Sequence, residues 1–306
     1  MTAITNAIIE CVPNFSEGVD TERVLAIVRS MRVPGVSLLD WSQDADHNRS
    51  VVTIAGPPAA VVEAAVLAAG KAAEVIDLTR QTGVHPRIGA ADVIPFVPVR
   101  DISLEHCALL ARQAGEEIWR RYGVPVYFYE AAAARPDRAR LEDVRQGQFE
   151  GLREASRRDP ARRPDVGGPD LHPTAGASAV GARRFLIAWN VFLDKPDVAL
   201  ARALAREVRD SGGGLKGVKA LGALVRGRAQ ISMNLTDFRV SSPSVVFADL
   251  KRRVEGRGAR IVEGELIGLI PAAAVEQNSE WVRQLEDFSS ETKVLERRME
   301  RPLEWP

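Results

Sequence analysis

The segment FLIAWNVF, Phe185–Phe192, is apolar except for Asn190 and has the length of a strand. The segments that follow it alternate between helical apolar spacing and short strand-like runs. They are predicted as a helix at Asp197–Asp210, strands at Val218–Val225 and Arg228–Thr236, a helix at Ser244–Arg257 and a strand at Arg260–Ile270. The second half of the chain therefore has the order strand, helix, strand, strand, helix, strand, which is the order of a split βαβ, ferredoxin-like unit.

The first half repeats this alternation with additions. Strands are expected near Ala7–Pro13, Val36–Asp40, Ser50–Ala55, Val93–Val99 and Val124–Tyr129, and helices at Thr21–Met31, Ala59–Asp77 and from Ser103 to about Tyr122. Because Pro95 and Pro98 interrupt one of these runs, we expect an edge or irregular strand there. The pattern predicts an α/β (α+β) protein of two related sandwiches, with subdomains at 1–181 and 182–306. The second subdomain is expected to end in a tail of two helices, Ala273–Phe288 and Ser290–Met299.

Length, charge and cysteine content restrict the class of protein. The chain has 306 residues, 41 Lys and Arg against 41 Asp and Glu, and two cysteines, Cys11 and Cys107. The sequence lacks the basic excess of a nucleic-acid-binding face, the long apolar run of a membrane span and the charged and apolar regions of a signal peptide. Two cysteines make no disulfide framework. We therefore expect a cytoplasmic globular protein with no nucleic-acid or membrane partner.

The segment GVHPRIGAADVIP, Gly83–Pro95, contains one of the four histidines. An imidazole has an unperturbed pKa near neutrality, so it can both accept and donate a proton there. Pro86 restricts the backbone of His85 to extended conformations, and Gly83 and Gly89 allow tight backbone geometry on either side. This pattern favours a held, partly exposed imidazole with an acid/base role. The alternative is a turn whose histidine bonds a carbonyl or caps a helix.

Three further segments are richer in polar residues than their apolar neighbours demand: Pro13–Gly18, Asp40–Ser50 and Asp165–Gly176, the last followed by Gly181–Arg184. Polar loops next to strands are where α/β proteins usually display site residues. Asp40 ends an apolar strand, so its carboxylate could orient an imidazole. Guanidiniums can bind carboxylates bidentately, and amides supply neutral hydrogen bonds. The candidates for substrate contacts are Asn14, Asn48, Arg49, Arg87, Arg183, Arg184 and Asn190.

Each candidate also has a structural alternative. Asp40 could cap a turn, and the arginines could pair with surface acids. The segment Ala131–Pro173 is expected to be irregular apart from a short helix near Arg138–Gln146, and it could be functional or an interdomain linker. A metal hydrolase would use Asp40, Asp44, Asp46, His47 and His85. Because no HExxH helix or compact ligand spacing supports that reading, no metal site is expected.

Six segments of the chain together resemble the formiminotransferase family. They are ECVPNFSEG (Glu10–Gly18), DHNRSVVTIAGPP (Asp46–Pro58), GVHPRIGAADVIPFVPV (Gly83–Val99), VPVYFYEAAA (Val124–Ala133), GARRFLIAWN (Gly181–Asn190) and GELIGLIP (Gly264–Pro271). The resemblance runs from Glu10 to about Ala272, so it rests on several long segments rather than on one short motif. Trp41–His47 departs from the animal members, because Ser42 stands at an acidic position. The resemblance therefore leaves open which carboxylate partners His85.

The resemblance implies two ferredoxin-like α/β sandwich subdomains with the substrates in a tunnel or cleft between them, and a homodimer. It implies transfer of the formimidoyl group of N-formimidoyl-L-glutamate to N5 of tetrahydrofolate, the co-substrate, in histidine degradation. The family's acid/base histidine falls on His85, with Asp40 as the candidate orienting group. Some relatives continue into a cyclodeaminase domain, for which this chain is too short. The folate-contacting loop falls on Gly167, Gly168, Pro169, Asp170, Leu171, His172, Pro173, Thr174, Ala175 and Gly176.

Two other activities stay open at this point. One is transfer of a formyl group from N-formylglutamate to tetrahydrofolate. A formyl carbon develops an oxyanion on attack and needs preorganised donors, whereas a protonated formimidoyl group starts as a cation and loses charge. The other is a folate-binding protein without turnover, against which the intact His85 segment argues.

Overall fold

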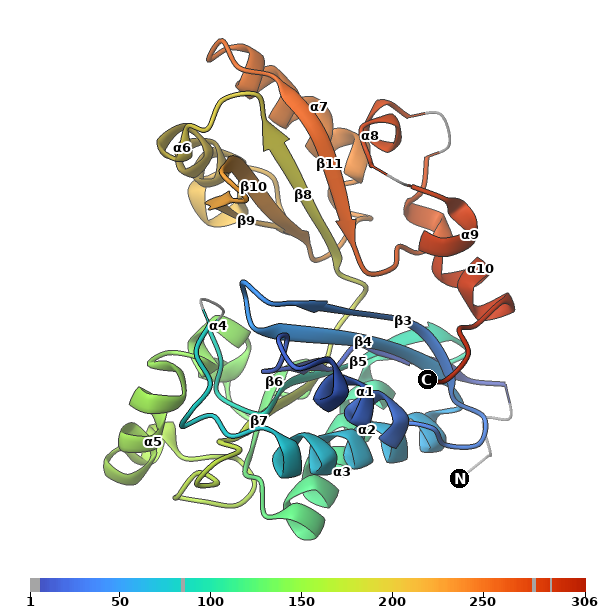
Figure 1. The fold of residues 1–306 in the computed structure, drawn as a ribbon, viewed down its shortest axis with the longest axis vertical. Helices are drawn as coiled ribbons and strands as arrows, with labels where there is room; N and C mark the ends of the chain where they lie inside the picture. The colour runs from blue at the N-terminus through green and yellow to red at the C-terminus, as the bar shows by residue number, and fades with distance from the viewer. Residues whose placement is uncertain (1–5, 84–85, 277–278, 287) are drawn as a thin grey trace. The chain divides into compact units, whose positions relative to one another are not determined.

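The structure, a computed structural model, describes residues 6–83, 86–276, 279–286 and 288–306. Internal contacts divide the chain into two compact units, the first running to Arg183 and including Pro302–Pro306, the second being Arg184–Arg301. Each unit has one sheet with helices packed on it, so the protein is a mixed α/β protein with two sheets (Figure 1). No helix in the described part of the chain is long and apolar enough to cross a membrane.

The sheet of the first unit has seven strands within the described residues, in the order β3-β4-β1/β2-β5-β7-β6. They are β1 (Ile8–Cys11), β2 (Asn14–Phe15), β3 (Ser37–Asp44), β4 (Arg49–Gly56), β5 (Ala91–Arg100), β6 (Val126–Glu130) and β7 (Ser178–Ala182). The pairs β5–β7 and β7–β6 are parallel, and the others are antiparallel.

The strand that contains Pro95 and Pro98 is central, because β5 pairs with β1 and β2 on one side and with β7 on the other. The expectation of an edge strand is therefore wrong, while the expected irregularity is present. Pro98 lies beyond the last residue of β5 that pairs with β7, and it is opposite Ile9 next to a register shift in β1. A proline there removes no ladder hydrogen bond on the β7 side.

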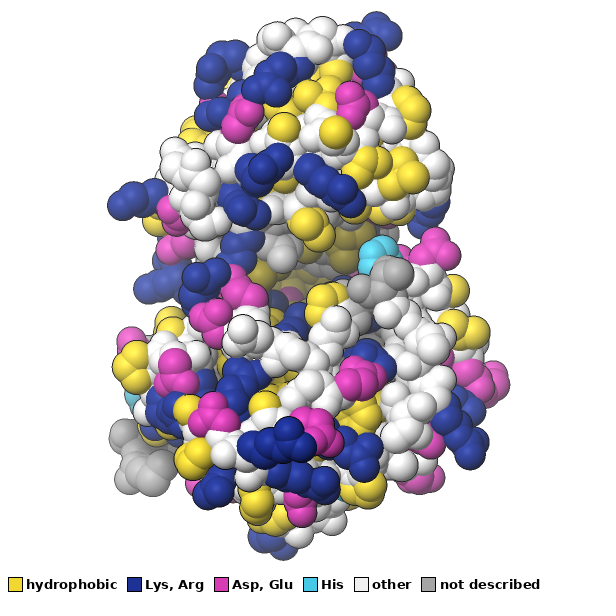
Figure 2. Space-filling model, turned by 90° about the vertical axis from the view of Figure 1, so that its left-hand side faces the viewer, with side chains coloured by type: hydrophobic (Ala, Val, Ile, Leu, Met, Phe, Trp, Pro, Cys, Tyr) yellow, Lys and Arg dark blue, Asp and Glu magenta, His cyan; other side chains and the backbone are white. Residues whose placement is uncertain are grey.

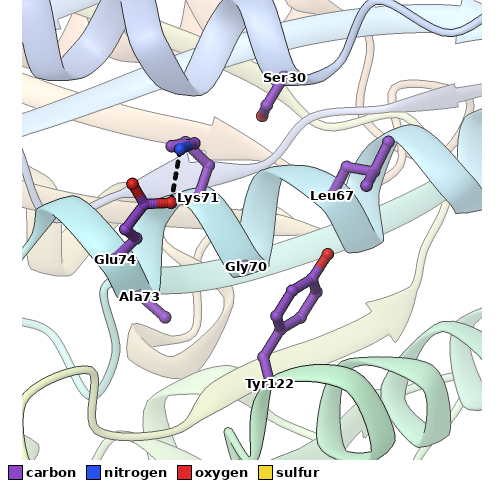
Figure 3. A pocket seen from close by; sticks show the side chains of 7 residues that line it. All are labelled: Ser30, Leu67, Gly70, Lys71, Ala73, Glu74 and Tyr122. Atoms are coloured by element: carbon purple, nitrogen blue, oxygen red, sulfur yellow. Dashed lines mark hydrogen bonds and ion pairs between the residues drawn. The ribbon is translucent and has the colours of Figure 1, made fainter.

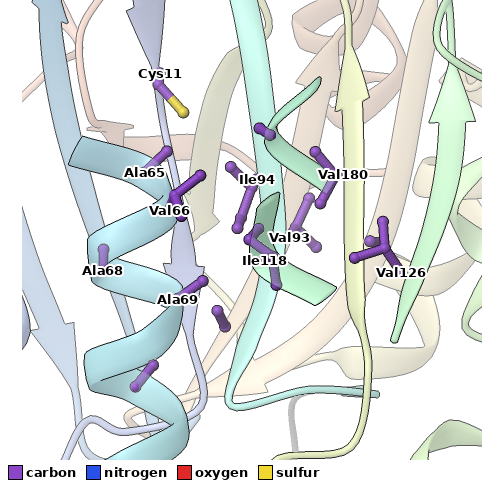
Figure 4. Packing of buried hydrophobic residues seen from close by; sticks show 14 of the residues in the cluster. Cys11, Ala65, Val66, Ala68, Ala69, Val93, Ile94, Ile118, Val126 and Val180 are labelled. Atoms are coloured by element: carbon purple, nitrogen blue, oxygen red, sulfur yellow. The ribbon is translucent and has the colours of Figure 1, made fainter. Parts of the chain in front are cut away.

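Three helices cover one face of this sheet: α1 (Thr21–Ser30), α2 (Pro58–Val75) and α3 (Leu104–Tyr122) (Figure 1). Buried residues of these helices and of alternate strand positions form the first core, part of which is drawn in Figure 4. The expected helix starts are confirmed. The side chains of Asp20 and Ser103 accept backbone N–H bonds at the starts of α1 and α3, and Gly123 (φ 64°) follows the end of α3.

Polar strand residues gather on the face opposite the helices, here called the polar face, because successive strand side chains point to opposite sides. In β4, Val52 and Ile54 belong to the core, so Arg49 and Thr53 point to the polar face. The pairing of β3, β1 and β2 with β4 brings further polar residues to the same side. The polar face carries Glu10, Asn14, Asp40, Arg49 and Thr53.

The segment between β6 and β7 is more helical than predicted. It contains η1 (Pro136–Arg138), α4 (Leu141–Val144), α5 (Gln148–Arg158) and η2 (Pro160–Arg162). The Tyr127 hydroxyl donates to the Arg162 carbonyl (2.7 Å), and the Arg138 guanidinium lies 4.9 Å from the Tyr127 ring centre. The segment therefore packs against β6. Sequence periodicity missed α5 because that helix buries only a few residues, among them Phe149 and Leu152.

The second unit has the element order β8 (Ile187–Leu193), α6 (Val198–Val208), η3 (Asp210–Gly212), β9 (Val218–Val225), β10 (Arg228–Leu235), α7 (Pro243–Glu255), β11 (Ile261–Ile267). Its sheet has the order β11-β8-β10-β9 with antiparallel neighbours. In its core the Trp189 ring lies 5.9 Å from that of Phe247 and 5.6 Å from that of Trp281. The order of helices and strands predicted for this half is confirmed.

The expected helix Ala273–Phe288 is wrong, and the expected helix Ser290–Met299 is divided at Val294 into two short helices. The described residues of the first segment form η4 (Ala272–Ala274) and α8 (Glu280–Arg283), followed later by α9 (Ser290–Lys293) and α10 (Leu295–Glu300). The reason for the first is a backbone contact with the edge of the sheet. The Gly264 N–H donates to the Gln284 carbonyl (2.7 Å), and the Glu286 N–H donates to the Gly264 carbonyl (2.9 Å). Those groups pair with β11 instead of continuing a helix, and they cover its free edge.

Both signs of charge are present on the surface. Figure 2 shows lysine and arginine side chains and carboxylates spread over the visible face. This agrees with the equal numbers of basic and acidic residues, 41 of each.

A substitution at Gly222 of β9 tests how closely this strand packs against α6 in the second unit. A Cβ at this position would lie 2.3 Å from the backbone N of Arg202 and 2.4 Å from the carbonyl carbon of Ala201, both in α6. We expect Gly222→Ala to lower the free energy of unfolding by about 1–3 kcal/mol, measured by urea denaturation. Gly151→Ala is the control: its Cβ would meet nothing within 4 Å in α5, so it should stabilise by about 0.5–1 kcal/mol. Equal stability of the two variants would contradict the packing argument.

Candidate active site

One asparagine joins three segments at the turn between β3 and β4. Oδ1 of Asn48 accepts the Gly18 N–H (2.9 Å), and its Nδ2 donates to the Thr82 carbonyl (2.7 Å). Nε2 of Gln81 donates to the Asn48 carbonyl (3.1 Å). A Cβ at Gly83 would lie 2.7 Å from a carbonyl oxygen of this turn, so the loop needs glycine to approach it. These contacts fix the beginning of the segment that carries His85.

Arg87 fixes the other end of the same segment. Its Nε and Nη2 donate to the side chain (2.5 Å) and backbone carbonyl (3.2 Å) of Gln81, and its Nη1 and Nη2 bond both carboxylate oxygens of Glu150 (3.3 and 2.9 Å). The Arg87 carbonyl accepts the Phe149 N–H (2.8 Å), and the Ile88 N–H donates to Asp92 Oδ1 (2.7 Å). Four of the five N–H groups of Arg87 are thus engaged within the protein. Its observed contacts hold the chain beside His85 in place, and its predicted contact with substrate stays a prediction.

His85 itself, with Val84, lies outside the described residues, so its catalytic role stays a prediction. What is described is that both flanks of the segment, 81–83 and 86–88, are tied to the turn at Asn48, to α5 and to the start of β5.

The glycine-rich loop expected to contact folate lies beside the His85 segment. The Ala90 N–H donates to the Ala175 carbonyl (2.9 Å), the Ala177 N–H donates to the Ile88 carbonyl (2.9 Å), and Gly176 forms a bridge with Gly89. The two segments that the sequence predicted as catalytic and cofactor-binding are therefore joined by backbone hydrogen bonds.

The first glycines of that loop have a structural reason of their own. Gly167 (φ 77°) faces the Trp119 ring, which a Cβ would approach to 2.6 Å, and Gly168 (φ 85°) faces Pro164. Asp170 pairs with Arg157 at the surface (2.5 Å). These contacts are internal to the unit, so loop composition alone does not identify a folate contact.

A second polar group surrounds Arg49 on the polar face. Nη2 of Arg49 donates to Oδ1 of Asn14, and Arg145, which follows α4, pairs with Asp92 at the start of β5. Asn14 is opposite Val93 in the sheet, so these two pairs are on neighbouring strands. Burial and the neighbouring Arg145 charge lower the pKa of Arg49 to about 10, against the pull of Asp92. Sequence reasoning missed Arg145 and Asp92, because no local pattern joins positions so far apart.

The predicted carboxylates of β3 are in different situations. Asp40 is opposite Thr53, on the polar face, and its proposed contact with His85 lies outside the described residues. Asp44 accepts bonds from the backbone N and Nδ1 of His47, both at 2.9 Å. Burial raises the pKa of Asp44, but these bonds outweigh it and lower the pKa below its usual value. Within the described residues no group of three or more potential metal ligands forms.

The remaining candidates fall on both units. Arg183 follows β7 in the first unit, where its backbone N–H donates to the Phe96 carbonyl (3.1 Å). Arg184 belongs to the second unit and is 3.8 Å from Asp237. Asn190 of β8 donates to Glu265 of β11 (3.1 Å). The expected arginine pair is thus divided between the two units.

A hollow of about 400 Å³ lies on the helical side of the first unit, between α1, α2 and the end of α3 (Figure 3). Its lining contains none of the predicted site residues. The two charged groups in it, Lys71 and Glu74, bond each other (2.5 Å), and the Tyr122 ring packs over Gly70. We assign no function to this hollow.

His172 makes the glycine-rich loop sensitive to pH. Its Nδ1 accepts the Ala175 N–H (3.0 Å), and burial lowers its pKa below 6.5. His172 therefore has a lower pKa in the folded protein than in the unfolded chain, so the unfolded chain binds a proton at a higher pH. The stability that neutral His172 contributes is complete above the pKa of the unfolded chain. It decreases as the pH falls toward the pKa of the folded protein. We expect urea unfolding of His172→Asn to lose less stability than the parent protein between about pH 7 and pH 5. Parallel pH profiles for the two proteins would contradict this role.

Comparison with known proteins finds matches to most of the chain. The formiminotransferase domain, N-terminal subdomain, matches residues 8–183, and the formiminotransferase domain matches residues 188–298. A glutamate formimidoyltransferase of Streptococcus pyogenes is 43% identical over 94% of this chain and 97% of its own length. One of Thermoplasma acidophilum is 41% identical over 96% and 98%.

A longer relative shares the same region. The formimidoyltransferase-cyclodeaminase of Gallus gallus is 40% identical over 88% of this chain and 51% of its own length. Among solved structures, a microcompartments protein of Desulfitobacterium hafniense has a TM-score of 0.24 and 10% identity over 85% of this chain and 93% of that chain, too low to inform fold or function. The two domain matches and the full-length relatives show that this chain belongs to the formiminotransferase family.

Proposed function

We propose that this protein is a glutamate formimidoyltransferase, which moves the formimidoyl group of N-formimidoyl-L-glutamate to N5 of tetrahydrofolate in histidine degradation. The proposal is supported by full-length similarity to two proteins of that name. The structural observation that carries it is the anchoring of the His85 segment at Asn48 and Arg87, with the glycine-rich loop hydrogen-bonded beside it.

In this proposal His85 is the acid/base group and moves one proton. N5 of tetrahydrofolate attacks the formimidoyl carbon, forming a carbon–nitrogen bond and a tetrahedral intermediate, and N5 gives its proton to the imidazole. The imidazole then returns a proton to the glutamate nitrogen, and the bond from that nitrogen to the formimidoyl carbon breaks. The proton count of the enzyme is unchanged over the cycle. Asp40, on the polar face, is the candidate that sets the tautomer of His85.

Tetrahydrofolate is the proposed co-substrate, and Gly167–Gly176 is its proposed contact loop. The backbone bonds from this loop to Ile88 and Ala90 support that role, because they bring the loop to the segment that carries the acid/base histidine. No step of the proposed reaction calls for a metal ion.

The proposed architecture is two ferredoxin-like sandwiches, 1–181 and 182–306, with a tunnel or cleft between them, in a cytoplasmic homodimer. The sheet order β11-β8-β10-β9 with two helices supports that assignment for the second subdomain. Chain association is tested by analytical ultracentrifugation, where a monomer at all concentrations would refute the dimer.

The decisive experiment offers tetrahydrofolate with either N-formimidoyl-L-glutamate or N-formyl-L-glutamate and follows the folate adduct by mass spectrometry. We expect the formimidoyl adduct to form. An adduct from the formyl donor alone would assign the protein to formyl transfer instead, and no adduct from either donor would leave a folate-binding protein without turnover.

His85→Ala tests the catalytic role within the same assay. We expect kcat to fall roughly 10²–10⁴-fold, because the proton transfers lose their acid/base group. His106→Ala is the matched control, since His106 lies in the first turn of α3 and its ring contacts Ser103. A His85→Ala protein with an unchanged thermal melting temperature and near-normal kcat would refute the assignment.

A further inference from the structure

The cluster around Arg49 consists of Arg49, Asn14, Asp92 and Arg145, and its two guanidiniums have fewer hydrogen-bond acceptors than N–H groups. Arg49 bonds the neutral Asn14 side chain, and Arg145 bonds Asp92. In the described part of the chain, Nε of Arg49 and Nε of Arg145 are both buried and have no hydrogen-bond acceptor. A buried N–H without an acceptor costs roughly 1–3 kcal/mol, so a group that supplies acceptors here is favoured.

The cluster is also short of negative charge. The carboxylates that act on Arg49 are Asp92, which is shared with Arg145, and Asp44 across the strand pair. Asp44 already accepts two bonds from His47, and 48% of its side chain is exposed, so water screens its charge. Two guanidiniums that act on each other and are near one buried carboxylate can attract an anion.

The arginine that anchors the His85 segment provides the internal comparison. Arg87 has its donors engaged by Gln81 and by both oxygens of Glu150. Arg87 therefore has four of its five N–H groups engaged within the protein. Among the described residues Arg145 pairs with Asp92, and 15% of its side chain remains exposed, so an incoming ligand can reach it.

We propose that Arg49 and Arg145 together bind a carboxylate of a glutamyl group. A carboxylate presents two oxygens, which match the parallel N–H groups of guanidiniums. The inference rests on the proposed function, because both substrates carry a glutamyl group: the donor is an N-substituted glutamate, and tetrahydrofolate has a glutamyl tail. It names a different pair from Arg183 and Arg184, whose expected role in holding the glutamate carboxylates stays a prediction.

Asn14 and Asp92 are positioning residues in this site. Asn14 holds one edge of Arg49, and its own Nδ2 donates to the Val12 carbonyl (2.8 Å), which fixes the side-chain orientation. Asp92 holds Arg145 through Oδ2 and the Ile88 N–H through Oδ1. The carboxylate site and the end of the His85 segment therefore share one aspartate.

The test titrates the protein separately with N-formimidoyl-L-glutamate, with tetrahydrofolate and with tetrahydropteroate, which lacks the glutamyl tail, by calorimetry. With one substrate absent no transfer occurs, so each titration measures binding. We expect Arg145→Gln to raise Kd for one glutamyl compound about 10–100-fold, because one charge-assisted contact is lost. We expect Arg145→Lys to recover part of this, since the charge stays and the planar fork is lost.

The compound affected identifies the source of the carboxylate. Weaker donor binding with unchanged tetrahydrofolate binding assigns the site to the donor. Weaker tetrahydrofolate binding, with tetrahydropteroate unaffected, assigns it to the folate tail. Arg121→Gln is the control, because Arg121 of α3 pairs with Glu63 and Glu117 away from this cluster.

Loss of Arg145 leaves Asp92 buried without its partner, which could itself destabilise the fold. A second variant therefore separates a loss of binding from a loss of folding. Arg145→Gln combined with Asp92→Asn removes both charges and keeps an acceptor for Ile88. The binding defect should persist in this double variant at a parental melting temperature. Parental affinity of Arg145→Gln for both substrates would overturn the inference even if the parent transfers the formimidoyl group. Absence of transfer by the parent would refute the proposed function, while the titrations would still report on the carboxylate site.

Discussion

The hydrogen bonds of Asn48 are the constraint on which the candidate site depends. One amide holds Gly18, which follows β2, and Thr82, which begins the His85 segment. The backbone of Asn48 is left-handed (φ 48°), a conformation that asparagine tolerates better than most residues, and it turns the chain into β4. Arg49 is the next residue. Each bond contributes only about 1 kcal/mol, but the same residue places both the histidine segment and the first arginine of the anion cluster.

The arginines of the first unit differ in how many of their N–H groups have a hydrogen-bond acceptor. A buried donor without an acceptor destabilises the fold, and Arg87 has four of its five N–H groups engaged. Arg49 and Arg145 each keep a buried Nε without an acceptor, and burial together with the charge of Arg145 lowers the pKa of Arg49. Exposure alone does not identify an arginine that binds a ligand. Arg184 is half exposed and yet has Asp237 as a partner.

The spacing of apolar residues predicted the helices and strands that depend on local sequence. It failed where hydrogen bonds to a distant part of the backbone determine the conformation. The helix expected at Thr21–Met31 and the element order of the second half are confirmed. The helix expected at Ala273–Phe288 is absent because Gln284 and Glu286 bond Gly264 of β11. In the site, Asn14 and Arg49 could be found because they adjoin apolar strands. Asp92 and Arg145 could not, because their pairing joins positions 53 residues apart and leaves no local pattern.

The glycines of the two neighbouring loops show why residue type alone does not identify a ligand. A Cβ at Gly89 would lie 2.1 Å from the Ala177 carbonyl oxygen, and a Cβ at Gly176 would lie 2.1 Å from that of Ile88. Glycine is required at both positions because two backbones pass each other there, whatever the loops bind. The same contact joins the histidine segment to the proposed folate loop through backbone atoms. A side chain at either glycine would therefore force the two loops apart.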